Sequence, residues 1–215
     1  GHQNEHARIS VIQKLVSGGD YIVVTSLDAI LQYTCDKEEF ESLCIDFELG
    51  KTFNLEKLTE DLVVMGYSRE DSVEGAGQFA IRGGILDIFP VGNENPYRIE
   101  FFDDETDSIR EFDTYTQRSL DKIDFARVTT ANEAVITDEK RDRIIAELEK
   151  RIRSAKRKKS DESYFIETTE SDIESFKEVR YFPSIDKYVS LVYDKIPSIT
   201  DYFSDNDLVF IIDPK

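Results

Sequence analysis

The sequence predicts a mixed fold, in which an antiparallel α+β domain is inserted into a partial parallel α/β domain. Two runs, YIVVT (21–25) and LVFII (208–212), are apolar on both faces, which is typical of buried parallel strands. Between them, five of the ten glycines fall within residues 75–92 and the apparent strands become short and alternating, as in antiparallel sheet with tight turns. We expect the two apolar runs to lie side by side in one parallel sheet.

Helical spacing and capping residues define the elements around these runs. A first helix is predicted from the apolar stripe Ile9, Ile12, Leu15 and Val16, and Ser17-Gly18-Gly19 ends it. Ser26 is expected to cap a helix that runs to about Tyr33. After a short strand, LCIDF (43–47), Asn54 is expected to cap a helix with the apolar residues Leu55, Leu58, Leu62 and Met65, which Gly66 ends.

The glycine-rich region predicts a sheet packed on the helix that follows Asn54. FAIR (79–82) and ILDI (85–88) form a hairpin on Gly83-Gly84, followed by YRIEFF, an acidic turn DDETD, SIREF and a return strand near 122–128. From Thr137 the pattern is helical again, with a stripe of Ile144, Ile145, Leu148 and Ile152, and a polar stretch follows at 160–175. The type of expected secondary structure changes near residues 43 and 130, which we expect to be domain boundaries.

Composition excludes several classes of function. The chain has 27 basic and 45 acidic residues, a net charge of −18, which opposes binding to a phosphate backbone. Its two cysteines, Cys35 and Cys44, form no C-x-x-C pair, so we expect neither a disulfide framework nor a zinc site, and a reducing cytoplasmic compartment. No membrane span or signal peptide is predicted. Gly1-His2 is typical of a tag remnant on an excised piece, and we assign no role to His2 or His6.

Side-chain alternation sorts the residues of the predicted sheet onto two faces. One face receives Phe79, Ile81, Leu86, Ile88, Tyr97, Ile99 and Phe101. The opposite face receives Ala80, Arg82, Ile85, Asp87, Arg98, Glu100 and Phe102. Spacing alone leaves two interpretations of this second face. It is either a solvated sheet surface with one exposed aromatic, or a protein-binding patch, since Arg and aromatic residues are enriched among interface hot spots.

Three other features were weighed as sites. Asp103, Asp104, Glu105 and Asp107 lack the glycine of a calcium loop, which favours a solvated turn over a metal site. The basic run KRIRSAKRKK (150–159) is interpreted as a solvated helix end rather than a nucleic-acid site. Asp213 follows an apolar strand, as the magnesium-binding carboxylate of a nucleotide-hydrolysing motor does, but no phosphate-binding loop is present. We therefore expect no catalysis, no cofactor and no metal.

The segments GQFAIRGGILDIFP (77–90), PYRIEFFDDETDSIREFD (96–113) and TQRS (116–119) together resemble the N-terminal UvrB-homology module of the bacterial transcription-repair coupling factors (Mfd). The likeness runs from about Ala7 to Pro214, with SITDYFSDNDLVFIID as a second anchor. It implies that residues 1–43, rejoined by a strand at 207–215, are part of a RecA-like domain 1a. Residues 44–130 would then be domain 2, which binds UvrA, and 131–206 domain 1b.

The resemblance implies an adaptor that recruits UvrA and so links a stalled RNA polymerase to nucleotide excision repair. The UvrA-binding residues would be Arg82, Arg98 and Phe102, while Gln78 stands where the family usually has glutamate. RNA polymerase would contact only other parts of the parent protein, an ATP-dependent DNA translocase, and this piece alone would bind no DNA. Two alternatives remain open: a fragment of UvrB, whose D-E-x-H box is DPK here, or a degenerate helicase-type ATPase domain.

Overall fold

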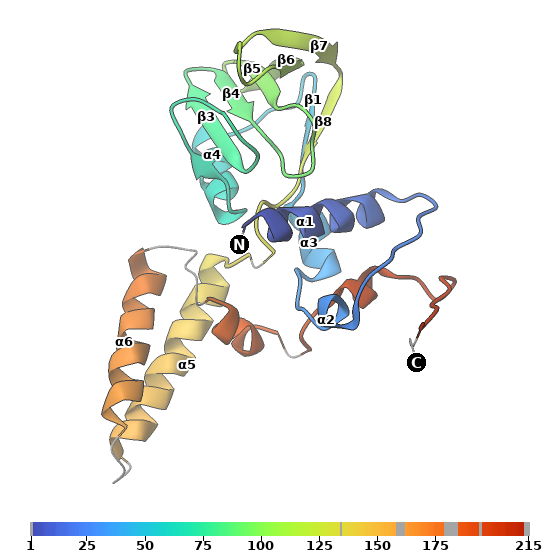
Figure 1. The fold of residues 1–215 in the computed structure, drawn as a ribbon. Helices are drawn as coiled ribbons and strands as arrows, with labels where there is room; N and C mark the ends of the chain where they lie inside the picture. Colours follow the sequence, from blue (N-terminus) through green and yellow to red (C-terminus); the bar gives the residue numbers. More distant parts are fainter. Residues whose placement is uncertain (1, 134, 158–161, 179–184, 194, 213–215) are drawn as a thin grey trace.

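The computed structural model describes residues 2–133, 135–157, 162–178, 185–193 and 195–212 (Figure 1). The helices of these ranges are α1 (His2–Ser17), α2 (Leu27–Ile30), α3 (Lys37–Leu43), α4 (Leu55–Val64), α5 (Asp138–Arg157) and α6 (Ser163–Glu178), with the 3-10 helices η1 (Ile185–Leu191) and η2 (Ile199–Tyr202). The strands are β1 (Ile45–Glu48), β2 (Ser68–Arg69), β3 (Gln78–Arg82), β4 (Ile85–Ile88), β5 (Tyr97–Phe102), β6 (Glu105–Phe112), β7 (Ser119–Ile123) and β8 (Phe125–Val128). The mixed α/β and α+β class is confirmed.

The strands of the glycine-rich region form a six-stranded sheet in the order β2-β3-β4-β5-β6-β7. All neighbours are antiparallel except β2 and β3, and β1 pairs with β8 in a separate two-stranded ribbon. The predicted hairpin is confirmed, because β3 and β4 pair from Phe79 opposite Ile88 to Arg82 opposite Ile85. This register leaves Gly83 and Gly84 as the two-residue turn.

One face of the sheet packs on α4 and forms the largest core. Leu58 and Leu62 of α4 are buried against sheet residues that include Leu86 and Ile99. The core continues into α1, whose Ile9 and Ile12 are buried in the same cluster, and Figure 1 shows α1 lying across the base of the sheet. The predicted apolar stripe of the first helix is thus a packing face.

Side-chain caps explain where several helices begin. The Asn54 side chain accepts a hydrogen bond from the backbone N–H of Lys57 at 2.9 Å, as predicted. Ser26 caps α2 in the same way, although α2 ends at Ile30 rather than near Tyr33. Helix α3 was not predicted from the sequence, and it begins at the cap Asp36, whose side chain accepts from the Glu39 N–H at 3.1 Å.

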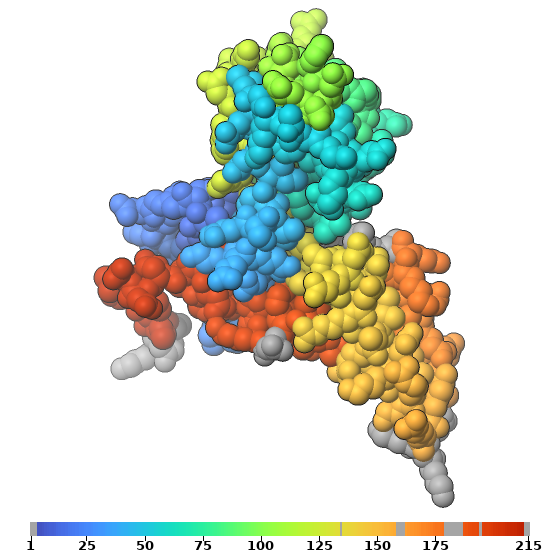
Figure 2. Space-filling model, turned by 180° about the vertical axis from the view of Figure 1, so that it is seen from behind, coloured from blue at the N-terminus to red at the C-terminus, as the bar shows by residue number. Residues whose placement is uncertain are grey.

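Helices α5 and α6 form a pair with a core of its own. The predicted stripe of α5 is buried through Ile144, Leu148 and Ile152, and it meets Ile173 and Phe176 of α6. Figure 2 shows from behind that this pair projects away from the sheet. The sequence analysis left 160–175 as an unassigned polar stretch, because apolar residues are sparse there. No helix in the described ranges is long and apolar enough to cross a membrane.

The expected parallel pairing of 21–25 with 208–212 is wrong for the described residues. Neither segment forms a strand, and large apolar side chains in both are exposed. A strand that is apolar on both faces needs a partner at its edges and a covering layer on each side. The described part of this chain supplies neither. The N-terminal and C-terminal regions meet instead through an isolated bridge between Tyr33 and Ser198 and through Tyr202, whose hydroxyl donates to the Cys35 carbonyl at 2.7 Å.

Candidate partner-binding face

The face of the sheet opposite α4, called the outer face below, carries the predicted candidate residues. Burial on β5 confirms the predicted alternation, because Phe101 is 9% exposed and its neighbour Phe102 is 76% exposed. Phe101 packs on the rings of Phe47 and Phe53, with ring centroids 6.4 and 6.0 Å away. The predicted strand register is therefore correct, and Phe102 is a large aromatic side chain on the outer face.

The Gly83-Gly84 turn brings β3 and β4 close to the end of β5. Gly83 has a φ of 59°, which glycine adopts at little cost. A Cβ on Gly84 would lie 2.7 Å from the carbonyl oxygen of Phe101, and the Phe101 N–H donates to the Gly84 carbonyl at 2.7 Å. Only glycine fits this approach without movement. The turn thus holds Arg82 and Ile85, the pair that closes it, beside the end of β5.

Two of the predicted residues, Arg82 and Arg98, converge on one buried carboxylate. Asp87 is 1% exposed, and its two oxygens accept from Nε and Nη2 of Arg98 at 2.7 and 2.8 Å. Its Oδ2 also accepts from Nη2 of Arg82 at 3.0 Å. A buried carboxylate needs such partners, because an unpaired charge in the interior is costly. Asp87 is therefore the centre of a three-residue ionic cluster.

Arg98 is held far more tightly than Arg82. Besides Asp87, it donates to the carbonyl of Gln117 at 3.2 Å, and its guanidinium lies 4.6 Å from the centroid of the Phe112 ring. Its hydrogen bond to Asp87 raises the pKa of the guanidinium above the ordinary value. The Arg98 side chain is only 16% exposed, whereas that of Arg82 is 58% exposed. Arg98 therefore offers a partner less surface than the sequence suggested.

The outer face also carries a small core that the sequence analysis did not foresee. Ala80 is buried with Val73 and Phe112, and the partly buried Phe89 packs against them. Alternation places Ala80 and Asp87 on the outer face, yet both are buried. The β2–β3 loop with Val73 and the β6–β7 loop with Gln117 cover this part of the outer face. Gln117 ties these loops together, since its side-chain amide donates to the Val73 carbonyl at 3.2 Å.

Sequence reasoning missed the importance of Asp87 and Ile85, although it placed both on the outer face. Asp87 lies opposite Arg98 in the β4–β5 register and diagonal to Arg82, so a search for acid–base pairs across strands would have found the cluster. Ile85 is 38% exposed beside Arg82. A lone exposed isoleucine gives no signal in the sequence.

Gln78, the departure from the family pattern, does not belong to the outer-face cluster. Its side-chain oxygen accepts from the backbone N–H groups of Glu74 and Gly75, each at 2.9 Å. A glutamate carboxylate would accept the same two bonds. The change to glutamine therefore keeps the loop contact.

The other candidate features offer no comparable site. Asp103 and Asp104 form the β5–β6 turn, Glu105 and Asp107 lie on β6, and the described residues contain no group of three or more His, Cys, Asp or Glu placed to hold a metal. Asp213 lies outside the described residues. Cys35 and Cys44 are free thiols, and burial raises the pKa of Cys44 to about 11, which makes it a poor nucleophile.

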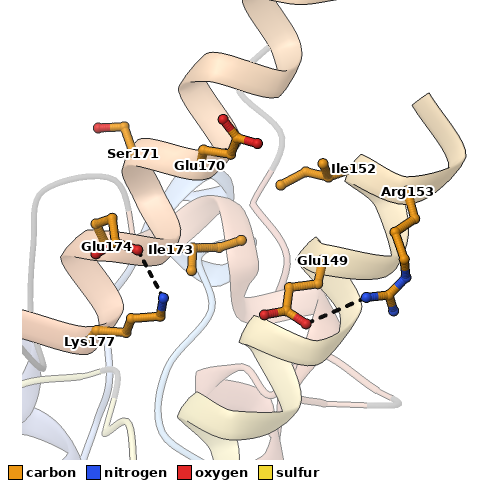
Figure 3. Close-up of a pocket in the computed structure, with 8 residues that line it drawn as sticks. All are labelled: Glu149, Ile152, Arg153, Glu170, Ser171, Ile173, Glu174 and Lys177. Carbon is orange, nitrogen blue, oxygen red and sulfur yellow. Dashed lines mark hydrogen bonds and ion pairs between the residues drawn. The ribbon is translucent and has the colours of Figure 1, made fainter. Parts of the chain in front are cut away.

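A pocket of about 560 Å³ lies between α5 and α6, distant from the outer face (Figure 3). Charged side chains dominate its lining, and they pair with one another or with neighbours. Arg153 lies 3.5 Å from Glu149, Lys177 2.8 Å from Glu174, and Glu170 2.9 Å from Lys156. These pairs are exposed and satisfied, so the pocket is a groove between two helices rather than a built binding site.

Comparison with known proteins places the outer face in a known domain. Residues 45–133, which hold all three predicted binding residues, match the family model described as the UvrB interaction domain. These residues are therefore similar to the UvrB interaction domain. The match includes β1 to β8 and α4, so the ionic cluster and Phe102 lie within the matched segment.

Similarity to larger proteins extends beyond that domain. The chain is 35% identical over 207 residues to the transcription-repair-coupling factor of Bacillus subtilis (strain 168), and 34% identical over 211 residues to that of Staphylococcus aureus (strain MRSA252). Each alignment includes 95% of this chain and 18% of the relative. The chain thus spans about a fifth of the length of these relatives, and their resemblance to it is not confined to the UvrB interaction domain.

Proposed function

We propose that this chain is an adaptor that recruits UvrA through the outer face of its UvrB interaction domain. In a transcription-repair-coupling factor, this recruitment would link a stalled RNA polymerase to nucleotide excision repair. The observation that carries the proposal is the exposure of Arg82 and Phe102 on one face of a domain whose other face is a packed core. The polymerase contact is assigned to other parts of a longer parent protein.

The chemistry of this face suits a protein partner. A guanidinium offers planar donors that match a carboxylate. Among the described residues, the Arg82 side chain donates one hydrogen bond, from Nη2 to Asp87, so its other nitrogens can bind a partner. An exposed phenylalanine buries a large apolar area and excludes water from neighbouring charges. Because Asp87 and Arg98 hold this region in place, binding of a partner costs little conformational entropy here.

The test is calorimetric titration of UvrA with the chain and with two variants. Arg82→Ala should weaken binding about 30- to 1000-fold, the loss expected of an interface hot spot. The matched control is Lys57→Ala, which removes another exposed, ion-paired cation from α4 on the opposite side of the sheet. It should bind as the unchanged chain does. If the unchanged chain and Arg82→Ala bind UvrA with equal affinity, Arg82 is not an interface residue.

We further propose that the isolated chain binds neither duplex DNA nor nucleotide. Four of the five described cations of the basic run already have carboxylate partners: Lys150 and Arg151 on Glu147, Arg153 on Glu149, and Lys156 on Glu170. With a net charge of −18, little counterion release remains to favour DNA. A gel shift at about 150 mM salt and titration with Mg-ATP test the two statements. Saturable nucleotide binding would instead support the helicase-type alternative.

The division of the chain is also a proposal. Residues 1–43 with 207–215, 44–130 and 131–206 would be three units, and the family match over 45–133 supports the middle one. Separate expression of 44–130 tests the division, because an independent domain should give a cooperative melt and bind UvrA.

A further inference from the structure

The three residues that the sequence singled out contribute unequally to the exposed surface of the outer face. Arg98 is mostly buried and its guanidinium is occupied by Asp87 and the Gln117 carbonyl. Arg82 and Phe102 remain exposed, but they stand on different strands, β3 and β5, with β4 between them. The residue of β4 at that position therefore decides whether they form one continuous contact.

Ile85 occupies this position. It pairs directly with Arg82 on one side and with Glu100 on the other. Phe102 follows Glu100 by two residues and so lies diagonal to Ile85, a separation that an aromatic side chain can span. Ile85 is 38% exposed, so an apolar side chain connects the arginine to the phenylalanine.

The nearest polar neighbour in this row, Glu100, has partners within the domain. Glu100 accepts a hydrogen bond from the Ser108 hydroxyl at 2.7 Å, and Nη2 of Arg110 lies 3.8 Å from the same oxygen of Glu100. These groups compensate one another across β5 and β6. Beside them, Ile85 and Phe102 form an exposed apolar strip with the cation Arg82 at one end.

We propose that Ile85 is a further contact residue of this face, and that the partner segment presents a carboxylate to Arg82 beside an apolar side chain that packs on Ile85 and Phe102. This inference rests on the proposed function and commits to UvrA as the occupant. Charge complementarity supports the carboxylate, since Arg82 is the exposed cation at the end of the strip. Exclusion of water by the apolar contact strengthens the ion pair.

Matched alanine variants test the contribution of Ile85. Val63 on α4 is 41% exposed, close to the 38% of Ile85, and lies on the opposite side of the sheet. Ile85→Ala should weaken UvrA binding about 5- to 10-fold, while Val63→Ala should change it less than about 2-fold. The double variant Ile85→Ala, Phe102→Ala should lose less than the product of the single losses, because both residues contact one apolar group.

A charge pair of variants tests the carboxylate. Ile85→Glu should bind at least about tenfold more weakly than Ile85→Lys, since the glutamate would repel a carboxylate seated at Arg82 and the lysine would attract it. Thermal melts show whether each variant is folded, and only the affinities of folded variants are compared. Equal affinities for Ile85→Glu and Ile85→Lys would overturn the carboxylate. Unchanged affinity of Ile85→Ala would overturn the contact, yet leave the proposed function standing if Arg82→Ala still weakens binding.

Discussion

The two faces of the six-stranded sheet differ in how their side chains are satisfied. The inner face buries Leu86, Ile99 and Phe101 against α4 and α1 in a continuous apolar core. The outer face has a small cluster around Phe112 and an ionic cluster centred on Asp87, and it leaves Phe102 exposed. One face of the same strands therefore supports the fold, while the other holds charges in fixed positions with apolar surface beside them.

The largest expected effect is on the inner face. Phe101→Ala should lower the free energy of unfolding by about 3–5 kcal/mol, because the cavity left among Phe47 and Phe53 removes their ring contacts. Denaturant unfolding followed by circular dichroism measures the loss. A variant as stable as the unchanged chain would show that this face is not the core.

The next effect tests whether Arg98 supports the fold. Arg98→Ala leaves Asp87 buried with Arg82 as its remaining partner, and should cost about 2–3 kcal/mol of stability, below the range for breaking a fully buried pair. The double variant Arg98→Ala, Asp87→Ala should recover part of the loss, because no buried charge remains. If Arg98→Ala melts normally, the ionic cluster does not support the fold.

A smaller effect concerns the turn that joins β3 to β4. Gly84→Ala places a methyl group 2.7 Å from the carbonyl oxygen of Phe101, so the β4–β5 pairing must shift. We expect a loss of about 1–3 kcal/mol, as for other overpacked sites. Because this turn positions Arg82, UvrA affinity should fall as well. Normal stability with normal affinity would mean that the approach of the turn to β5 is not needed.

Local sequence patterns predicted this sheet well. The period of two on β5 separated Phe101 from Phe102, and the paired glycines located the turn next to Arg82. Both signals depend on a few neighbouring residues, so tertiary context did not alter them. The inner-face core followed from the same alternation and from the stripe on α4.

Features that depend on distant partners were harder to predict. The apolar runs at 21–25 and 208–212 have the composition of buried strands, but strand formation needs neighbours that the described chain does not provide. Helix α6 has few apolar residues and is held by packing on α5 rather than by a strong pattern of its own. The burial of Asp87 depends on loops that fold over the sheet from both sides, which alternation cannot show.

The central claim is that the face without the main core is the one that binds UvrA. Phe102→Ala tests it most directly, because this exposed side chain contributes little to the fold. We predict a change in stability within about 0.5 kcal/mol and a 30- to 1000-fold loss of UvrA affinity, estimated roughly from interface hot spots. Calorimetric titration and a thermal melt of the same sample measure both. Full UvrA affinity in a folded Phe102→Ala variant would contradict the account.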